Sequence, residues 1–369
     1  MKILVTGAKG FIGKNLISEL RNRQGHDIFE YDINTDPLLL DEYCKIVDFV
    51  FHLAGVNRPK ELSEFIEGNV DFTTTLLNKL KEHHNSCPVM MSSSIQAELP
   101  NPYGKSKKAG EQRLINHGRD TGSKILIYRF PNVFGKWCKP QYNSAIATFC
   151  HNIAHDLSIT VNDPDVVMNL VYIDDLVEEL INALEGKGNH SGDFYEITPI
   201  HTITLGEIVK LLSSFKESRK ERSIPHLSDA FTKKLYSTYL TYLPEDQFSY
   251  QLKMNIDDRG SFTEFIKTID RGQVSVNISK PGVTKGNHWH HTKNEKFLVV
   301  SGEGVIRFRK INSSKVIEYF VDGKKLEVID IPPGFTHHIE NLGTGDMVTL
   351  MWVNEIFDPD KQDTYFMEV

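Results

Sequence analysis

"TGAKGFIG", residues 6–13, follows the first β-rich run of the chain and opens its first helical stretch. Gly7, Gly10 and Gly13 have the spacing that lets a backbone turn tightly and approach a pyrophosphate. The N-terminus of the helix that follows would then stabilise this anion. The stretch therefore predicts a dinucleotide-binding turn between a β-strand and an α-helix.

Short apolar runs alternate with helical stretches in the first part of the chain. The strand candidates are KILVTG, DIFEYD, VDFVFHLAG, CPVMMSSS and KILIYRFPNV. Near-continuous apolar runs of this kind are typical of a parallel sheet that is buried on both faces. Ile12, Leu16 and Leu20 form one helical stripe after the first strand, which predicts a βαβ unit. Later helices are predicted at residues 174–184 and 204–215.

The character of the sequence changes after about Tyr242. QVSVNISK alternates Val274, Val276 and Ile278 with polar residues, and the β-rich runs that follow are separated by Gly and Pro. Short strands with little helix predict an antiparallel sandwich or barrel. Since 369 residues exceed what one hydrophobic core usually supports, we predict two domains, 1–243 and 244–369.

Composition and charge argue against several classes of protein. A net charge of -7 without a local basic patch argues against binding to nucleic acid or to an anionic membrane. Four cysteines without paired spacing indicate a reducing compartment. The N-terminal apolar run is too short for a signal peptide, and no run of about 18 apolar residues occurs. We therefore expect a cytoplasmic protein with no membrane or nucleic-acid partner.

Two residues near the glycine turn give opposite indications about the dinucleotide. Asp32 ends the second predicted strand, 19 residues after Gly13, where an acidic side chain binds the adenine ribose hydroxyls of NAD. Lys9 lies within the turn, where a cation would face the 2′-phosphate of NADP. The residues alone leave this choice open.

YGKSK places Tyr103 and Lys107 four residues apart, on one face of a predicted helix. A phenol is a poor acid at neutral pH, but an adjacent ammonium stabilises the phenolate and lowers the phenol pKa. Tyr103 is thus a candidate proton donor to a carbonyl oxygen that accepts a hydride. Ser94, at the end of the preceding strand, is placed to hydrogen-bond the same oxygen.

These motifs together resemble the extended short-chain dehydrogenase/reductases that act on nucleotide sugars. The resemblance covers most of residues 1–243. It rests on the set of Ser94, Tyr103 and Lys107 and on the motifs TGAKGFIG (6–13), HLAG (52–55), NV (69–70), RFPNVFG (129–135) and VYIDDLV (171–177). It implies a Rossmann domain with a smaller substrate-binding lobe, a Ser-Tyr-Lys catalytic set and a substrate contact at Asn132. The implied cofactor contacts are Gly7, Lys9, Gly10, Phe11, Ile12, Gly13, Asp32, Leu53, Ala54, Tyr103 and Lys107. SSSIQAE departs from the family pattern, because it lacks the usual aromatic-glycine pair after the serines.

A second group of chemistry-bearing residues lies in the β-rich part. GVTKGNHWHHTKNEKF, residues 282–297, contains His288, His290 and Glu295, and PPGFTHHIEN, residues 332–341, contains His337. Alternate residues of a strand point the same way, so these side chains can converge inside a barrel. Three imidazoles and a carboxylate suit zinc, iron, nickel or manganese, which can polarise a carbonyl as a Lewis acid.

Both segments are similar to the two metal motifs of the cupin superfamily, with Leu326 in place of the leading glycine of the second motif. The resemblance implies an all-β cupin barrel with a metal held by His288, His290, Glu295 and His337. His291 and His338 fall outside the pattern, and we expect them to face elsewhere.

DDRGSFTEF and VSVNISKPGVTKGNH also resemble the nucleotide-sugar 3,5-epimerases, which are cupins that work without a metal. In that family the residue that matches His288 is the base that removes a proton next to a ketone. The residue that matches Lys285 contacts the nucleotide phosphates, and we place Arg259 with it as a substrate contact. Whether His288 is a metal ligand or the catalytic base stays open.

A keto-sugar reductase joined to an epimerase-like cupin is chemically coherent, because a ketone at sugar carbon 4 acidifies the proton on carbon 3. Epimerisation would come first, and reduction would then prevent its reversal. The pairing resembles the CapF family of bifunctional capsule-synthesis enzymes over essentially the whole chain. The resemblance implies conversion of a UDP-2-acetamido-2,6-dideoxy-4-hexulose, a UDP-linked 4-keto amino sugar, to UDP-N-acetyl-6-deoxy-L-talosamine, toward UDP-N-acetyl-L-fucosamine. It also implies NADPH, zinc and a homodimer.

Two other functions stay open at this point. One is a 4-keto nucleotide-sugar reductase whose cupin is purely structural or dimerising. The other is a cofactor-sensing regulatory protein without catalytic activity. The set of Ser94, Tyr103 and Lys107 argues against the regulator, because a sensor needs no proton donor.

Overall fold

Two units make up the computed structural model, which describes residues 1–369. Unit 1 comprises Met1–Ser213 and Asp229–Pro244, and unit 2 comprises Ser214–Ser228 and Glu245–Val369. The change of unit after Pro244 lies next to the boundary expected after residue 243. Residues 214–228 belong to unit 2 although unit 1 resumes after them, an arrangement that the sequence did not lead us to expect.

A seven-stranded sheet in the order β2-β1-β3-β4-β5-β9-β8 forms the centre of unit 1. Its strands are β1 (Lys2–Thr6), β2 (Asp27–Tyr31), β3 (Phe49–His52), β4 (Val89–Ser94), β5 (Ile125–Phe130), β8 (His190–Ser191) and β9 (Phe194–Tyr195). The first five strands run parallel, and only β8 is antiparallel to its neighbour. Every residue of β3 and β4 is buried, as the near-continuous apolar runs predicted.

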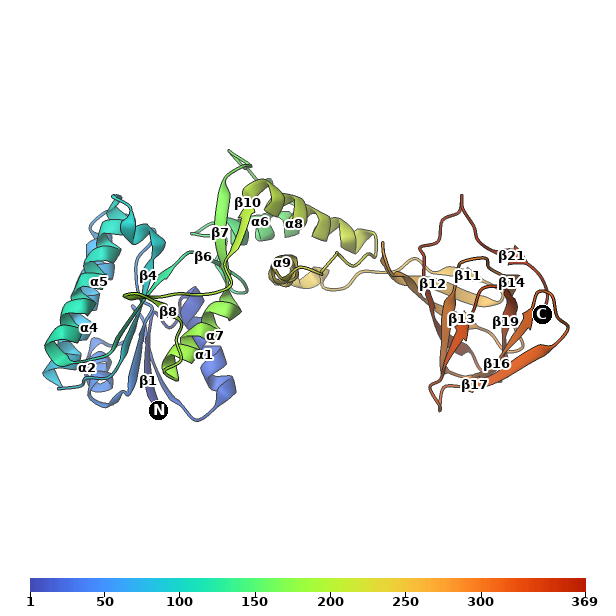
Figure 1. Ribbon diagram of the computed structural model, residues 1–369, viewed down its shortest axis with the longest axis horizontal. Helices are drawn as coiled ribbons and strands as arrows, with labels where there is room; N and C mark the ends of the chain where they lie inside the picture. Colours follow the sequence, from blue (N-terminus) through green and yellow to red (C-terminus); the bar gives the residue numbers. More distant parts are fainter. The chain divides into compact units, whose positions relative to one another are not determined.

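Helices cover both faces of this sheet, with α2, α4 and α5 on one side and α1 and α7 on the other (Figure 1). Their bounds are α1 (Phe11–Arg23), α2 (Pro37–Ile46), α4 (Phe72–Glu82), α5 (Pro102–Thr121) and α7 (Ile173–Leu184). Between β3 and α4 lie the short α3 (Glu64–Ile66) and the π-helical turn η1 (Glu67–Asp71), and the 3-10 turn η2 (Ile95–Glu98) follows β4. Each face therefore has its own apolar layer, with Leu16 and Leu176 in one and Leu76 and Leu114 in the other.

The rest of unit 1 is built around a three-stranded sheet in the order β10-β7-β6. Its elements are β6 (Asn132–Phe134), α6 (Ala145–Ala154), β7 (Val167–Tyr172), β10 (His201–Thr204), α8 (Leu205–Lys220, whose end belongs to unit 2) and α9 (Ala230–Leu240). The N-terminus of α8 is a capping box: the Thr204 hydroxyl accepts from the Glu207 N–H at 3.2 Å, and the Glu207 carboxylate accepts from the Thr204 N–H at 3.0 Å. No helix of the chain combines the length and the apolar composition needed to cross a membrane.

Unit 2 consists of two antiparallel sheets, as predicted (Figure 1). One has the order β11-β12-β13-β20-β15-β18 and the other β17-β16-β19-β14-β21. The strands of the first are β11 (Asn255–Asp257), β12 (Gly260–Thr268), β13 (Gly272–Ser279), β15 (Glu295–Ser301), β18 (Val328–Ile331) and β20 (Met347–Val353). Those of the second are β14 (Thr284–Trp289), β16 (Glu303–Lys310), β17 (Val316–Asp322), β19 (Phe335–Asn341) and β21 (Tyr365–Phe366). The 3-10 turn η3 (Glu245–Gln247) precedes them.

The strand β13 buries its polar side chains rather than its apolar ones. Ser275, Asn277 and Ser279 are at most 1% exposed, whereas the apolar residues that alternate with them are only half-buried. The period of two was thus predicted correctly, but hydrophobicity alone would assign the wrong face to the interior. The apolar core of unit 2 lies instead between other strands, around Phe297 and Ile306.

Residues 214–228 are attached to unit 2 through the far end of β12. The Ile224 N–H donates to the Lys267 carbonyl at 3.0 Å, and the Lys267 N–H donates to the Arg222 carbonyl at 3.0 Å. The Arg222 guanidinium also pairs with the Glu264 carboxylate at 2.9 Å. Residues 222–224 therefore join the segment after α8 to β12 through backbone hydrogen bonds.

Candidate active sites

The glycine turn joins β1 to α1 at the carboxyl edge of the central sheet. Gly7 has a φ of +68°, and a Cβ on Gly13 would lie 2.3 Å from the Gly7 carbonyl oxygen, so both positions require glycine. α1 begins at Phe11 without a side-chain cap and without an acidic residue in its first turn. The N–H groups of that turn are therefore available to an anionic ligand, as the motif predicted.

The loops that follow β1, β3, β4 and β5 line a cleft of about 570 Å³. Parallel α/β sheets bind ligands at this edge, where the chain switches from one side of the first strand to the other. All the expected cofactor contacts line the cleft except Asp32 and Ala54, and Asn132 lines it as well. The structure thus brings the first-half site residues to one place.

Asp32 lies beside the glycine turn, but backbone groups occupy its carboxylate. Its Oδ2 accepts from the Lys9 N–H at 2.7 Å, and its Oδ1 accepts from the Ile33 N–H at 2.9 Å. The side chain of Lys9 is exposed and lines the cleft. Asp32 therefore braces the turn, and Lys9 is the residue of the two that lines the cleft.

Ser94, Tyr103 and Lys107 meet in the same cleft. Ser94 is the last residue of β4, while Tyr103 and Lys107 lie one turn apart near the start of α5. The side chains of Ser94 and Tyr103 share a hydrogen bond. The Lys107 ammonium donates to the Ser92 carbonyl at 2.8 Å, which holds it against the end of β4.

Burial sets the protonation of these groups. It raises the pKa of Tyr103, although the hydrogen bond with Ser94 acts in the other direction, and it lowers the pKa of Lys107 to about 8. We expected the ammonium to lower the phenol pKa, but the pKa is raised, because removing water from around the phenol outweighs the contribution of Ser94. Tyr103 is therefore protonated at neutral pH and able to donate its proton.

His52, the histidine of HLAG, links the strand before the glycine turn to the helical segment after β3 through hydrogen bonds. The Thr73 hydroxyl donates to the Asn69 carbonyl at 2.9 Å, so it must accept from Nε2–H of His52 at 2.8 Å. His52 Nδ1 then accepts from the Thr6 hydroxyl at 2.8 Å. Burial lowers the pKa of His52 to about 3, so the ring stays neutral. One directed chain of hydrogen bonds thus joins the glycine turn to η1.

The segment after β6 also lines the cleft, which the sequence did not lead us to predict. Trp137, Lys139 and Tyr142 contribute side chains from the stretch GKWCKPQYN. Nζ of Lys139 is 5.6 Å from the ring centroid of Tyr142, within the range of a cation-π contact. The signal that would have identified this wall is a run of cations and aromatic residues directly after a cleft-edge strand.

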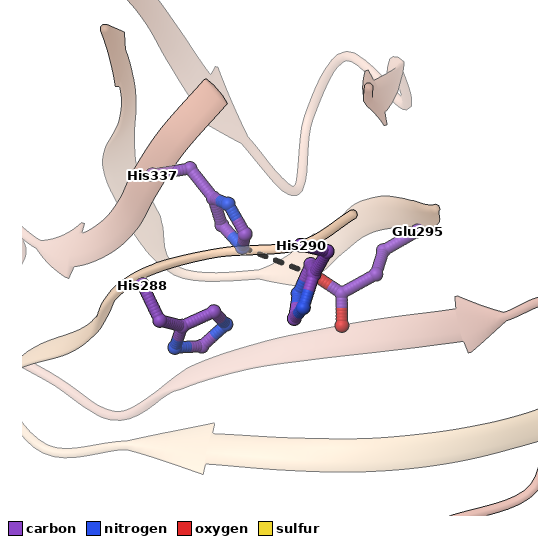
Figure 2. Close-up of side chains that lie close together, drawn as sticks. All are labelled: His288, His290, Glu295 and His337. Atoms are coloured by element: carbon purple, nitrogen blue, oxygen red, sulfur yellow. Dashed lines mark ion pairs between the residues drawn. The ribbon is translucent and has the colours of Figure 1, made fainter. Parts of the chain in front are cut away.

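His288, His290, Glu295 and His337 converge inside unit 2 (Figure 2). His288 lies in β14, His290 follows the end of that strand, Glu295 begins β15, and His337 lies in β19. One donor atom of each lies within 4.8 Å of the others. Oε2 of Glu295 is 3.0 Å from Nε2 of His337 and 3.5 Å from Nε2 of His290. The structure therefore brings the four residues of the predicted cluster together.

A β-bulge aims β14 at this cluster. The register between β14 and β19 shifts between Gly286 and His288, and Asn287 adopts a φ of +59° at the extra position. The shift places His288 directly opposite His337. Bulges of this kind change the direction in which side chains point next to functional sites. This explains how residues on the two sides of the bulge in β14 can point to different faces of the sheet.

Three buried atoms of the cluster lack a hydrogen-bond partner: His290 Nε2, Glu295 Oε2 and His337 Nε2. Unpartnered buried polar atoms are uncommon in proteins, and here they converge on one point. Burial acts to raise the pKa of Glu295, but the adjacent imidazoles outweigh it and bring the pKa down to about 2. Nitrogen and carboxylate donors in this arrangement fit a divalent metal ion such as zinc.

His288 lies at the edge of the cluster with a neutral ring. Burial, and then the nearby His337, lower the pKa of His288 to about 4. A neutral imidazole is what both a metal ligand and a general base require, so the geometry accommodates either role. His291 and His338 lie outside the cluster: His291 packs against Trp289 and Tyr365, and His338 hydrogen-bonds to Asn287 at 2.9 Å.

Arg259 and Lys285 share a second pocket, of about 470 Å³, in unit 2. Arg259 pairs with the Asp257 carboxylate at 2.6 Å. Nζ of Lys285 donates to the Asn277 amide oxygen at 2.9 Å and to the Ile278 carbonyl at 2.8 Å. Two cations that face one pocket suit a ligand that carries phosphate groups.

Comparison with known proteins identifies the family. Residues 3–197 match the NAD dependent epimerase/dehydratase family, and residues 255–365 match the polysaccharide biosynthesis C-terminal domain. The chain belongs to the NAD dependent epimerase/dehydratase family. The family description supports the expectation of a nicotinamide cofactor, although it does not choose between the two forms.

The similarity to individual proteins extends over the whole chain. UDP-2-acetamido-2,6-beta-L-arabino-hexul-4-ose reductase of Pseudomonas aeruginosa is 44% identical over 369 residues, which cover 100% of this chain and 99% of that protein. The crystal structure of the capsular polysaccharide assembling protein CapF from Staphylococcus aureus is 57% identical, with a TM-score of 0.96 and full coverage of both chains. A structure of CapF with the inhibitor 3-isopropenyl-tropolone is 52% identical, with a TM-score of 0.90 and full coverage of both. The resemblance to the CapF family and the fold class, Rossmann then β-rich cupin, are thereby confirmed.

We predict that the purified protein contains a divalent metal ion and that His337→Gln loses it. The substitution removes one of the nitrogen donors, whereas His291→Gln, the matched control, changes a histidine outside the cluster. Elemental analysis after dialysis measures the metal content, and thermal unfolding checks that both variants are folded. Equal metal content in the two variants would contradict the assignment of His337 as a ligand.

Proposed function

We propose that the chain is a bifunctional nucleotide-sugar enzyme of capsule synthesis. In this proposal unit 2 epimerises carbon 3 of a UDP-2-acetamido-2,6-dideoxy-4-hexulose, and unit 1 reduces its 4-ketone with NADPH. The product is UDP-N-acetyl-6-deoxy-L-talosamine, on the route to UDP-N-acetyl-L-fucosamine. The observation that carries the proposal is that each unit has its own set of proton-handling side chains, around Tyr103 in one and His288 in the other. The full-length similarity to a nucleotide-sugar reductase and to CapF supports it.

In unit 1, reduction of a ketone requires a hydride and a proton. A bound nicotinamide would supply the hydride. Tyr103 would donate the proton to the carbonyl oxygen, since its phenol is protonated at neutral pH, and Ser94 would hold the same oxygen through a hydrogen bond. The Lys107 ammonium would then stabilise the phenolate that is left.

The choice of NADPH over NADH is supported by the contacts of Asp32. Recognition of the NAD ribose requires a carboxylate that accepts from the two ribose hydroxyls. Each carboxylate oxygen of Asp32 accepts one backbone N–H group, and Lys9 is an exposed residue that lines the cleft. A 2′-phosphate would gain a charge-assisted contact with Lys9 that a hydroxyl would not.

In unit 2, inversion at carbon 3 requires removal of a proton next to the ketone. The neutral imidazole of His288 would accept that proton, and a proton delivered from solvent to the opposite face of carbon 3 would complete the inversion. His290, Glu295 and His337 would hold a divalent metal, zinc in our proposal, which supplies Lewis-acid polarisation of a carbonyl. Lys285 and Arg259 would bind the diphosphate of the nucleotide.

A homodimer is also part of the proposal, and the outer face of the sheet that contains β13 supports it. Val276 of β13 pairs with Leu350 of β20, and both are only half-buried on this face. Contiguous apolar residues on an outer sheet face are typical of a protein–protein interface. A second copy of the chain can cover the same patch through a two-fold axis.

We predict that ketone reduction slows as the pH rises through about 8. The pKa of Lys107 is lowered to about 8, so its ammonium is present below that pH and is lost above it. The measurement is kcat/KM for NADPH oxidation from about pH 6 to about pH 10. Exchange of the carbon 3 proton, which does not use Lys107, serves as the control. A reduction rate that stays level across this range would contradict the role of the ammonium.

The two-site model predicts separable activities. In deuterated water without cofactor, the protein should place deuterium at carbon 3 of the keto sugar. Tyr103→Phe, which removes the proton donor, should lose NADPH oxidation by at least about 100-fold but retain the exchange. Tyr43→Phe, a matched change on α2 outside the cleft, should retain both activities.

Each failure of this experiment has a distinct meaning. If the protein reduces the ketone without carbon 3 exchange, the cupin is structural, and the single-activity reductase is the better description. If Tyr103→Phe loses reduction and exchange together while it stays folded, the two-site model is wrong. If neither activity occurs with the native protein, the regulator is favoured.

Val276→Asp is expected to shift the protein from dimer to monomer. The substitution places a charge on the half-buried apolar face of β13, where burial against a second copy is costly. Val316→Asp on β17, a residue that is 43% exposed on the other sheet, is the matched control. Light scattering across a range of protein concentrations measures the mass. A native monomer, or a Val276→Asp variant that still dimerises, would refute this interface.

A further inference from the structure

The C-terminal segment of the chain lies against the strands that carry the histidine cluster. β21 (Tyr365–Phe366) pairs with β14, with Phe366 opposite His288. The Met367 N–H donates to the Asn287 carbonyl at 3.0 Å, and its own carbonyl accepts from the Thr336 hydroxyl. The segment is therefore joined both to β14 and to β19, which hold His288 and His337.

Asp363, just before β21, contacts the cluster through its backbone. Nδ1 of His290 is hydrogen-bonded to the Asp363 carbonyl oxygen. A carbonyl only accepts hydrogen bonds, so the proton must be on Nδ1, and Nε2 carries the lone pair. Nε2 is the buried, unpartnered atom that lies 3.5 Å from Glu295 Oε2. The tail thus fixes His290 in the tautomer and orientation that a metal ligand requires.

The side chain of Asp363 organises the loop that separates two members of the cluster. Its Oδ1 accepts from the His291 N–H at 2.9 Å, and its Oδ2 accepts from the N–H groups of Thr292 at 2.7 Å and Lys293 at 2.9 Å. The Thr292 hydroxyl adds a fourth bond at 3.1 Å. Residues 291–294 are the whole connection between His290 and Glu295. Burial acts to raise the pKa of Asp363, but these four hydrogen bonds outweigh it and hold the pKa well below its usual range.

We infer that Asp363 is a positioning residue for the metal site of unit 2, acting on His290 through its carbonyl and on the His290–Glu295 connection through its carboxylate. The inference rests on the metal site put forward above and extends it to a residue 73 positions from His290 in the sequence. Its consequence is reciprocal: if the ordered tail strengthens metal binding, then a bound metal must stabilise the tail by the same factor.

The test compares metal affinity in full-length variants. Asp363→Ala removes the four hydrogen bonds to the loop and is expected to weaken metal binding by about 10- to 100-fold, the usual effect of losing a group that orients a ligand. Asp360→Ala is the matched control, because it removes an exposed carboxylate of the same tail that accepts no hydrogen bond. Zinc affinity is measured by competition with a chromophoric chelator, and thermal unfolding checks the fold.

Asp363→Asn keeps one acceptor oxygen and is expected to give an intermediate loss of zinc affinity. It tests the role of Asp363 if the alanine variant does not fold. Amide hydrogen exchange gives a readout independent of affinity. In the native protein, zinc should slow exchange at residues 291–293 and 365–367, and in Asp363→Asn this protection should shrink.

The outcomes separate this inference from the metal site itself. If the native protein holds no metal, then both the metal site and the role of Asp363 are refuted. If the native protein and Asp360→Ala bind zinc but the folded Asp363 variants bind it equally well, only the role of Asp363 is refuted. A selective loss in the Asp363 variants, together with zinc-dependent protection of the tail, supports the inference.

Discussion

Removal of water from ionisable side chains determines which chemistry each unit can perform. In unit 1, burial keeps Tyr103 protonated and brings the pKa of Lys107 to about 8. In unit 2, it keeps His288 neutral and leaves three donor atoms of the cluster without partners. The strands and turns around these groups mainly serve to hold them out of water, because the same residues at a solvated surface would have ordinary pKa values and satisfied hydrogen bonds. In the proposed function, proton transfer at both sites depends on this single effect.

The parts of the sites that sequence predicted are those defined by local spacing. Three glycines in one turn, a tyrosine and a lysine on one helix face, and two histidines on one strand each occupy a short stretch whose geometry follows from the type of element. The contacts that were missed act across the fold. Asp363 reaches His290 from 73 positions away, and Asp32 uses its carboxylate on the backbone of Lys9, 23 positions away. A single sequence holds no record of such pairings, since Asp363 looks like an ordinary surface acid and Asp32 was predicted only as a cofactor contact.

Hydrophobic alternation had a similar limit in β13. It predicted a strand correctly, but not that Ser275 and Asn277 would face the interior. In β13 the polar residues face inward and the apolar residues face outward, which inverts the usual rule. A strand with its apolar residues inward and a strand with its apolar residues outward therefore have the same period-two pattern. Only the placement of neighbouring strands distinguishes them.

The order of segments along the chain has a consequence for how the protein is made. Residues 229–244 return to unit 1 after residues 214–228 have entered unit 2. In that returning stretch, Phe231 packs against Phe134, and the buried Tyr242 hydroxyl donates to the carbonyl of Cys138, a residue of the cleft wall, at 2.6 Å. During synthesis, residues 214–228 of unit 2 therefore leave the ribosome before residues 229–244, which complete unit 1. No single cut of the polypeptide can separate the two units, because each unit contains a segment that lies between two segments of the other.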